Sequence, residues 1–339
     1  MFPRLNLLRC CFALLLLGAL APLHATEAGH CLQLDDPGER LACYDQAHGR
    51  QPSTAVEAAP EGVHLPGHSS FHPYKTMYAL PVWHRSAPNL QPSSPAAGHT
   101  VSTPLVEDRT ESKFQLSFQS ELAQDLFKLD SSLRFAYTQT SRWQVYAAGQ
   151  SRPFRENNYE PELLAVFATR PYSWGGWQSR SLTLALNHQS NGRADPYSRS
   201  WNRAILDWEL VSKPDAAGHW QLNLRPWWRI PENSLNDDNP DISRYLGRGE
   251  AILTRQAGRH RLSLLLRHGF RSNDRGGAQF DWAFPLPKLP WCRDGEGFLC
   301  KHPDTLRGHL QIFTGYGESL IDYNHKANYL GLGVSLAEW

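Results

Sequence analysis

The chain has 339 residues, and its 34 Lys and Arg nearly balance its 33 Asp and Glu, which gives a formal net charge of +1. This balance gives no electrostatic reason to expect a nucleic-acid partner, because such partners normally meet a strongly basic surface. After the first 25 residues, no apolar run reaches the about 18 residues that a spanning helix needs. A helical membrane bundle is therefore excluded. A membrane β-barrel is not excluded, because its strands alternate apolar and polar residues.

Residues 1–25 have the organisation of a secretory signal peptide. Arg4 and Arg9 precede an apolar run from Cys10 to Ala21, and small residues suited to cleavage follow it, ending at Ala25. We therefore expect the mature chain to enter an oxidising compartment.

Four cysteines lie beyond the signal peptide, and three pairings of them are possible. The two local pairings, Cys31–Cys43 and Cys292–Cys300, are the simplest in an exported protein. No Cys or His spacing indicates zinc. These disulfides are expected to staple loops without a chemical role.

Residues 26–112 predict a flexible periplasmic extension. Nine prolines lie between Pro52 and Pro104, and Ser, Ala, Gly and His fill much of the remainder. Such a composition does not supply the apolar residues of a packed core.

Residues 113–339 show the period-two alternation of β-strands. The clearest run is 181–188, where Leu182, Leu184 and Leu186 share one face. Similar runs cover 114–122, 202–210, 221–225, 261–266 and 329–336. We predict an all-β fold, a transmembrane antiparallel β-barrel of about twelve strands.

Charges and aromatic residues favour the membrane barrel over a soluble sandwich. Arg203, Asp207 and Glu209 share the polar face of their strand, which suits a polar lumen. Aromatic residues near segment ends are interpreted as interfacial girdles, with ordinary core aromatics as the alternative: Tyr172, Trp174, Trp177, Trp201, Trp227 and Trp228.

One hairpin carries the candidate chemistry. His188 and Ser190 are two residues apart, so both project from the face of Leu186. Asn202 lies on the apolar face of the next strand, and pairing of 188 with 202 centres the turn on Asp195-Pro196. Alternation therefore predicts that the imidazole, hydroxyl and amide meet on the lipid-facing exterior.

Polar groups on a lipid face are costly unless they satisfy one another, which makes them functional candidates. His188 can accept the proton of Ser190, and Asn202 can fix the imidazole tautomer. The alternative from spacing alone is a polar collar at a strand end.

The longer string H-x-S-N-G-x-x-x-x-x-S-R-S-W-N-R, from His188 to Arg203, closely resembles the signature of outer-membrane phospholipase A. Further resemblance lies at residues 153–156, 158–161, 237–242 and 315–323, and it covers about 113–339. It implies a barrel in the outer membrane of a Gram-negative bacterium. It also implies hydrolysis of phospholipids at either acyl position and of lysophospholipids.

The resemblance also implies roles for residues of this chain. Ser190 would be the nucleophile, His188 the general base and Asn202 its orienting partner. The Gly192 amide, at a tight Asn-Gly turn, is expected to be a further oxyanion donor. The family needs calcium and is active as a dimer, and calcium accepts oxygen ligands of this kind. The implied ligands are the main-chain oxygen of Arg193, the hydroxyl of Ser198, Ser151 of the partner's loop and, at a second site, Asp238.

Two other functions remain open from the sequence. A lipid A deacylase also uses a His-x-Ser pair on an outward strand face, although its barrels are shorter. A porin-like barrel without catalysis would use the hairpin as a structural collar. A soluble α/β-hydrolase is disfavoured, because no serine lies in a G-x-S-x-G turn.

Overall fold

The computed structural model describes residues 31, 39–40, 43–44, 63–64, 70–125, 129–169, 173–287 and 305–336. The chain divides into two compact units, residues 1–59 and 60–339. In the first unit a disulfide joins Cys31 to Cys43, which confirms that local pairing. The predicted signal peptide and the Cys292–Cys300 pair lie outside the described residues.

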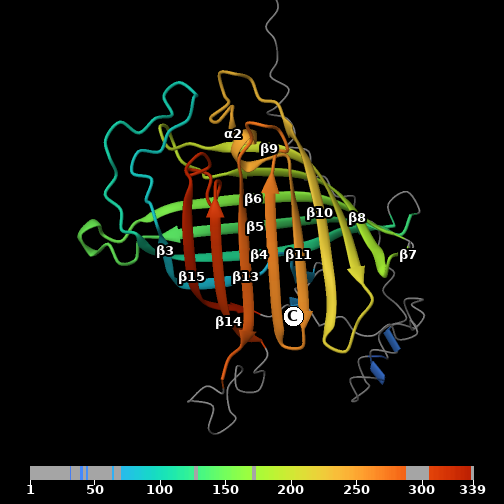
Figure 1. The fold of residues 1–339 in the computed structure, drawn as a ribbon. Coiled ribbons are helices and arrows are strands. Elements are labelled where there is room, and N and C mark those ends of the chain that lie inside the picture. The colour runs from blue at the N-terminus through green and yellow to red at the C-terminus, as the bar shows by residue number, and fades with distance from the viewer. Residues whose placement is uncertain are drawn as a thin grey trace, which may run out of the picture. The chain divides into compact units, whose positions relative to one another are not determined.

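Twelve antiparallel strands in the described part of the second unit close into a barrel, as predicted (Figure 1). The ring closes where β4 pairs with both β3 and β5. The strands of the ring are β3 (Tyr78–Arg85), β4 (Thr110–Gln124), β5 (Ser131–Trp143), β6 (Phe154–Ala168), β8 (Trp177–Ser190), β9 (Ser200–Ser212), β10 (Gly218–Ile230), β11 (Gly249–Ala257), β12 (His260–His268), β13 (Gly276–Pro285), β14 (Leu306–Gly315) and β15 (Ala327–Leu336).

Short elements add to this ring. Strand β2 (Ser70–Pro73) pairs with β4 and with β1 (Val63–His64), and β7 (Ser173–Trp174) pairs with β8. A 3-10 turn, η4 (Ala148–Gln150), precedes β6, and helix α2 (Ile242–Leu246) precedes β11. None of the helices that the structure describes is long and apolar enough to cross a membrane.

The predicted boundary at residue 113 differs from the structure. Strand β3 lies inside the predicted extension, yet it pairs with β15 and β4, and β4 itself begins at Thr110. Pro81 argued against a strand here in the sequence. The register of β3 with β4 shifts between Leu80 and Trp83, because proline has no N–H to donate to the ladder. Residues 70–112 therefore belong to the barrel unit rather than to a flexible extension.

Side chains alternate between the two faces of the wall. Outward-facing residues such as Leu116, Leu186 and Leu332 are more than half exposed, which suits contact with acyl chains. Inside, Arg203 pairs with Glu160 at 3.0 Å and Arg225 pairs with Asp207 at 3.2 Å. A polar cavity of about 500 Å³ is lined by Arg203, Asp207 and Glu209, which confirms their predicted inward orientation.

Two of the predicted girdle aromatics are instead core residues. Trp201 and Trp227 are buried inside the barrel and pack edge to face, with ring centroids 6.2 Å apart. Because alternation continues along each strand, Trp201 shares the inward face of Arg203, whereas Trp228 points outward and is 63% exposed. Tyr172 lies outside the described residues.

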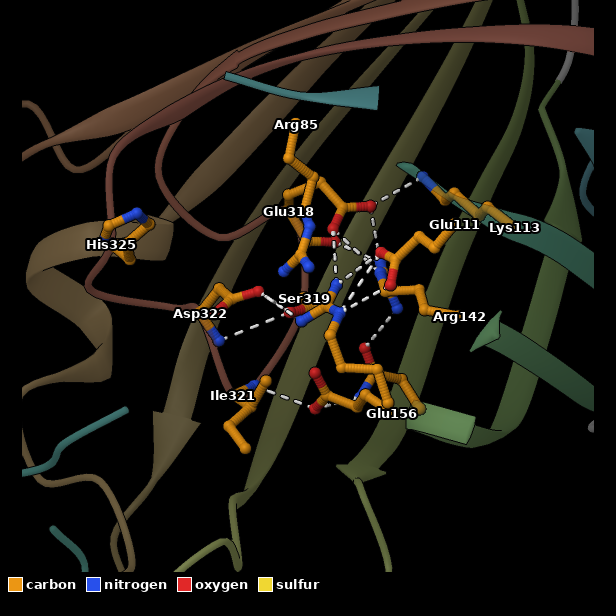
Figure 2. Close-up of polar contacts among 12 residues, drawn as sticks. Arg85, Glu111, Lys113, Arg142, Glu156, Glu318, Ser319, Ile321, Asp322 and His325 are labelled. Carbon is orange, nitrogen blue, oxygen red and sulfur yellow. Dashed lines mark hydrogen bonds and ion pairs between the residues drawn. The ribbon is translucent and has the colours of Figure 1, made fainter. Parts of the chain in front are cut away.

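A network of charged side chains lies inside the barrel next to the 316–326 loop (Figure 2). Glu318 accepts hydrogen bonds from Arg142, and its carboxylate lies 2.8 Å from Lys113 Nζ. Arg155 bridges Glu111 and Asp322 at 2.9 and 2.7 Å. These paired charges hold the loop against β4, β5 and β6.

Glu156 extends the charged network to the candidate hairpin. Its Oε1 accepts a hydrogen bond from the Ile321 amide at 2.8 Å and a longer one, at 3.4 Å, from Asn191 (Figure 2 shows the first). The main-chain oxygen of Arg155 accepts a hydrogen bond from Arg193 at 2.9 Å. The connection between β8 and β9 therefore rests on a buried polar base.

Candidate active site

The hairpin of β8 and β9 has the predicted register. His188 pairs directly with Asn202, and exposed Leu184, Leu186 and His188 alternate with buried Ala185 and Asn187. His188 Nδ1 lies 2.8 Å from Asn202 Oδ1. The imidazole and the amide therefore meet on the outer wall, as strand alternation predicted.

Ser190 lies on the same outward face, two residues beyond His188. It pairs with Ser200 on β9 and with Tyr159 on β6. Within the part of the chain that the structure describes, no hydrogen bond joins the Ser190 hydroxyl to the His188 ring. Catalytic hydrogen bonds are often long before substrate binds. The absence of this one therefore does not exclude proton transfer from the Ser190 hydroxyl to the His188 ring.

The orientation of the Asn202 amide fixes the tautomer of His188. The Nδ2 group of Asn202 donates a hydrogen bond to Glu232 Oε1 at 2.7 Å. Its Oδ1 therefore faces His188 and can only accept, so Nδ1 of His188 carries the proton. The other ring nitrogen, Nε2, is left as the base, which is the state that can accept a hydroxyl proton.

The 191–199 connection is held from within by Asn191, which is 2% exposed. Its Oδ1 accepts hydrogen bonds from the Arg193 and Arg199 amides at 3.3 and 3.0 Å, and its Nδ2 donates to the Tyr197 oxygen. Gly192 has a φ of +63°, and a Cβ there would meet the Tyr159 ring at 3.0 Å. A glycine is thus favoured at this position, two residues beyond the end of β8.

Oxygen ligands converge next to this connection. Ser198 Oγ donates to Asp238 Oδ2 at 2.7 Å, so two ligands that the family resemblance assigns to separate calcium sites are in direct contact. Asp195 and Asp238 both approach one point, because a single atom, His99 Nε2, lies 3.0 and 3.1 Å from their carboxylates. A hydroxyl and two carboxylates are oxygen donors of the type that calcium prefers, although no group of three or more His, Cys, Asp or Glu side chains in the described residues is arranged to hold a metal ion.

The other two predicted ligands are placed less closely. Arg193 lies in the same connection, with its guanidinium over the Tyr197 ring at 4.2 Å. Ser151 is exposed, has a φ of 57° and lies between η4 and β6. This loop and the β8–β9 connection share one barrel end, because Tyr159 of β6 pairs with Ser190. No hydrogen bond or ion pair of the described residues joins Ser151 to the other ligands.

Glu232, His99 and Asp195 were missed as site residues in the sequence. Glu232 follows the end of β10, and His99 lies in the proline-rich segment between β3 and β4, so neither belongs to the hairpin motif. Burial raises the pKa of Glu232, and the negative charge of Asp237 adds to this effect. The sequence signal that could have identified Glu232 was an acidic residue just after the strand that follows the candidate hairpin.

Comparisons with known proteins show which family this chain is similar to. A family model described as phospholipase A1 matches residues 61–336. A putative phospholipase A1 of Neisseria meningitidis is 37% identical over 77% of this chain, and the match spans 64% of that protein's length.

Solved structures are also similar. The Escherichia coli outer membrane phospholipase A has a TM-score of 0.65 and 31% identity, over 82% of this chain and 95% of the other. The Salmonella typhi outer membrane phospholipase dimer with bound calcium has a TM-score of 0.65 and 33% identity, over 81% and 94%.

Proposed function

Because the chain belongs to the phospholipase A1 family of outer-membrane hydrolases, we propose that it hydrolyses acyl esters of membrane phospholipids with calcium, as a dimer. The substrates are phospholipids, at the A1 and A2 positions, and lysophospholipids. The observation that carries the proposal is the outward-facing pair of His188 and Asn202 beside Ser190, in a wall of exposed leucines.

The chain's own residues account for the acyl transfer. Ser190 Oγ attacks the ester carbonyl while His188 Nε2 accepts its proton, and Asn202 Oδ1 stabilises the imidazolium through Nδ1–H. His188 then returns the proton to the leaving alcohol oxygen, which leaves an acylated Ser190. A water molecule, deprotonated by His188, releases the fatty acid and regenerates the hydroxyl.

An amide is suited to the third position because of its surroundings. A carboxylate directly against hydrocarbon would carry a desolvation cost of several kcal/mol unless it were fully paired. The neutral Asn202 orients the ring without that cost. The Gly192 amide, at the turn after Ser190, is proposed as an oxyanion donor.

The calcium ligands are proposed from the same chain and from its partner. Arg193 (main-chain oxygen) and Ser198 would hold one ion together with Ser151 of the second protomer, and Asp238 would belong to a second site within the monomer. Calcium held by these residues would supply positive charge that stabilises the developing oxyanion. The Salmonella relative is a dimer with bound calcium, which supports the proposal of a calcium-dependent dimer.

The test is an assay of purified protein in detergent on diacyl phospholipid and lysophospholipid, with calcium or with EDTA. We expect activity only with calcium, and a loss of at least about a thousandfold in Ser190→Ala. Ser212→Ala, at the opposite end of β9, is the control and should retain activity. Hydrolysis of lipopolysaccharide instead would indicate a lipid A deacylase, and conductance without hydrolysis a porin-like barrel.

The shared site has a separate test. Ser151→Ala and Ser190→Ala should each be inactive at limiting calcium, whereas a mixture should recover activity. In the mixed dimer one intact Ser190 meets the intact Ser151 of its partner. Absence of recovery, with dimers demonstrated by cross-linking, would contradict the assignment of Ser151.

A further inference from the structure

Glu232 continues the outward row of the candidate site. Ile230, the last residue of β10, pairs directly with Asn202, and Ile230 is 41% exposed on the outer wall. Glu232 follows two residues later, and its Oε1 accepts the Asn202 amide at 2.7 Å. The contacts therefore run from His188 on β8 through Asn202 on β9 to Glu232, two residues beyond the end of β10.

The Glu232 carboxylate is directed at the Asn202 amide, because the cation next to it on β10 is already paired with another group. Arg229 is the nearest cation on the same strand, but its guanidinium pairs with Asp237 at 2.6 Å and donates to the Pro240 oxygen. Glu232 is partly buried. Its hydrogen bond to Asn202 is thus made in a partly desolvated place, where it is stronger than in water.

We propose that Glu232 is a positioning residue, which holds the Asn202 amide with its oxygen towards His188 and polarises it as the imidazolium forms. This inference rests on the proposed function. An amide without a partner can turn over and present its NH₂ to Nδ1, which favours the tautomer with Nε2 protonated and unable to accept a proton. Glu232 removes that alternative, because a carboxylate only accepts.

The arrangement keeps a negative charge one hydrogen-bonded group away from the imidazole. Asn202 faces the acyl chains, whereas Glu232 lies beyond the end of β10 in the 231–248 connection. The hydrogen-bonded series of His188, Asn202 and Glu232 can therefore include a carboxylate without placing it on the hydrocarbon face. Glu232 does not touch the substrate in this scheme and acts only through Asn202.

The alternative is that Glu232 merely fastens the 231–248 connection to β9. A double-mutant cycle separates the two roles, because a positioning residue acts only when Asn202 is present. The variants are Glu232→Ala, Glu232→Gln and Asn202→Ala, with both double variants. Asp215→Asn, a carboxylate-to-amide change at the opposite end of the barrel, is the matched control.

We expect Glu232→Ala to lower kcat about tenfold with an unchanged KM, which is the size of one net hydrogen bond. Glu232→Gln keeps an acceptor but loses the charge, so its kcat should lie between those of Glu232→Ala and the wild type. In the Asn202→Ala background neither change should lower kcat further. Asp215→Asn should have wild-type kcat.

A wild-type kcat in Glu232→Ala, or equal losses with and without Asn202, would overturn the inference. If Glu232→Ala does not fold, the isosteric Glu232→Gln in the two backgrounds decides the question alone. Retained activity in Ser190→Ala would contradict the proposed function itself, and it is therefore distinguishable from a failure of the Glu232 inference.

Discussion

The imidazole Nε2 of His99 lies 3.1 Å from Oδ1 of Asp238, although the two residues are 139 positions apart in the chain. The same nitrogen lies 3.0 Å from Asp195. Ser94 donates a hydrogen bond to the Asp238 main-chain oxygen, and Arg199 donates one to that of His99. The 86–109 connection therefore places a ring nitrogen between the carboxylates of Asp195 and Asp238, and Asp238 is a proposed calcium ligand.

His99→Ala should lower the calcium concentration needed for half-maximal activity about fivefold, because the ion no longer competes with the ring for the Asp238 carboxylate, which also accepts the Ser198 hydroxyl. Calcium titration of lysophospholipid hydrolysis measures this. His84→Ala is the control, since that exposed histidine contacts Thr110 instead. A raised calcium requirement in His99→Ala would contradict competition and indicate that the ring supports the site.

Asn202→Asp should lose at least about tenfold in kcat, because it places a second carboxylate 2.7 Å from Glu232 and removes the donor between them. The double variant Asn202→Asp with Glu232→Gln restores a donor–acceptor pair in the reverse direction. Steady-state kinetics should show a higher kcat in the double variant than in Asn202→Asp. An equal or lower kcat would mean that the 202–232 contact is not what the first change disturbs.

Gly192→Ala should lower the free energy of unfolding by about 1–2 kcal/mol, because φ at this position is +63°. It should also lower activity, since the new Cβ would press on Tyr159 beside Ser190. Gly258→Ala is the matched control, with a φ of +55° and nothing within 4 Å of its Cβ. Denaturant unfolding should show similar losses in both variants, and only Gly192→Ala should lose activity.

Glu318→Gln should lower the free energy of unfolding by about 3–5 kcal/mol, because Arg142 and Lys113 would then face a neutral group inside the barrel. Denaturant unfolding followed by tryptophan fluorescence measures this. Asp130→Asn, an exposed carboxylate in the β4–β5 connection, should change stability little. A similar loss in both variants would show that the network is not the cause.

The same carboxylate predicts a loss of stability in acid. Burial by itself would raise the pKa of Glu318, but the charges of Arg142 and Lys113 outweigh it and hold that pKa well below the ordinary 4.5. The folded protein therefore binds the proton less readily than the unfolded chain. The stabilisation is complete above pH 4.5 and declines as the pH falls through the depressed pKa. Unfolding curves at successive pH values should show this slope in the wild type and a weaker one in Glu318→Gln.

Strand alternation was sufficient to predict the outward hairpin. Because side chains change face at every residue, the positions of His188 and Ser190 on one strand and Asn202 on the next followed from local pattern alone. The same rule places Trp201 on the inner face of the barrel with Arg203, so its assignment to an interfacial girdle was wrong. Proline density failed at β3, where Pro81 occupies a register shift instead of ending the strand.

Local sequence pattern was enough to predict the class of fold and the face of the candidate catalytic groups, and it carried the resemblance to a lipid-hydrolysing family. Only the tertiary structure placed Glu232 against Asn202 and His99 between Asp195 and Asp238. Those contacts join a strand end and two long connections that closure of the barrel brings to one rim. No local period encodes them, because the distance between such segments depends on how all twelve described strands pair around the ring.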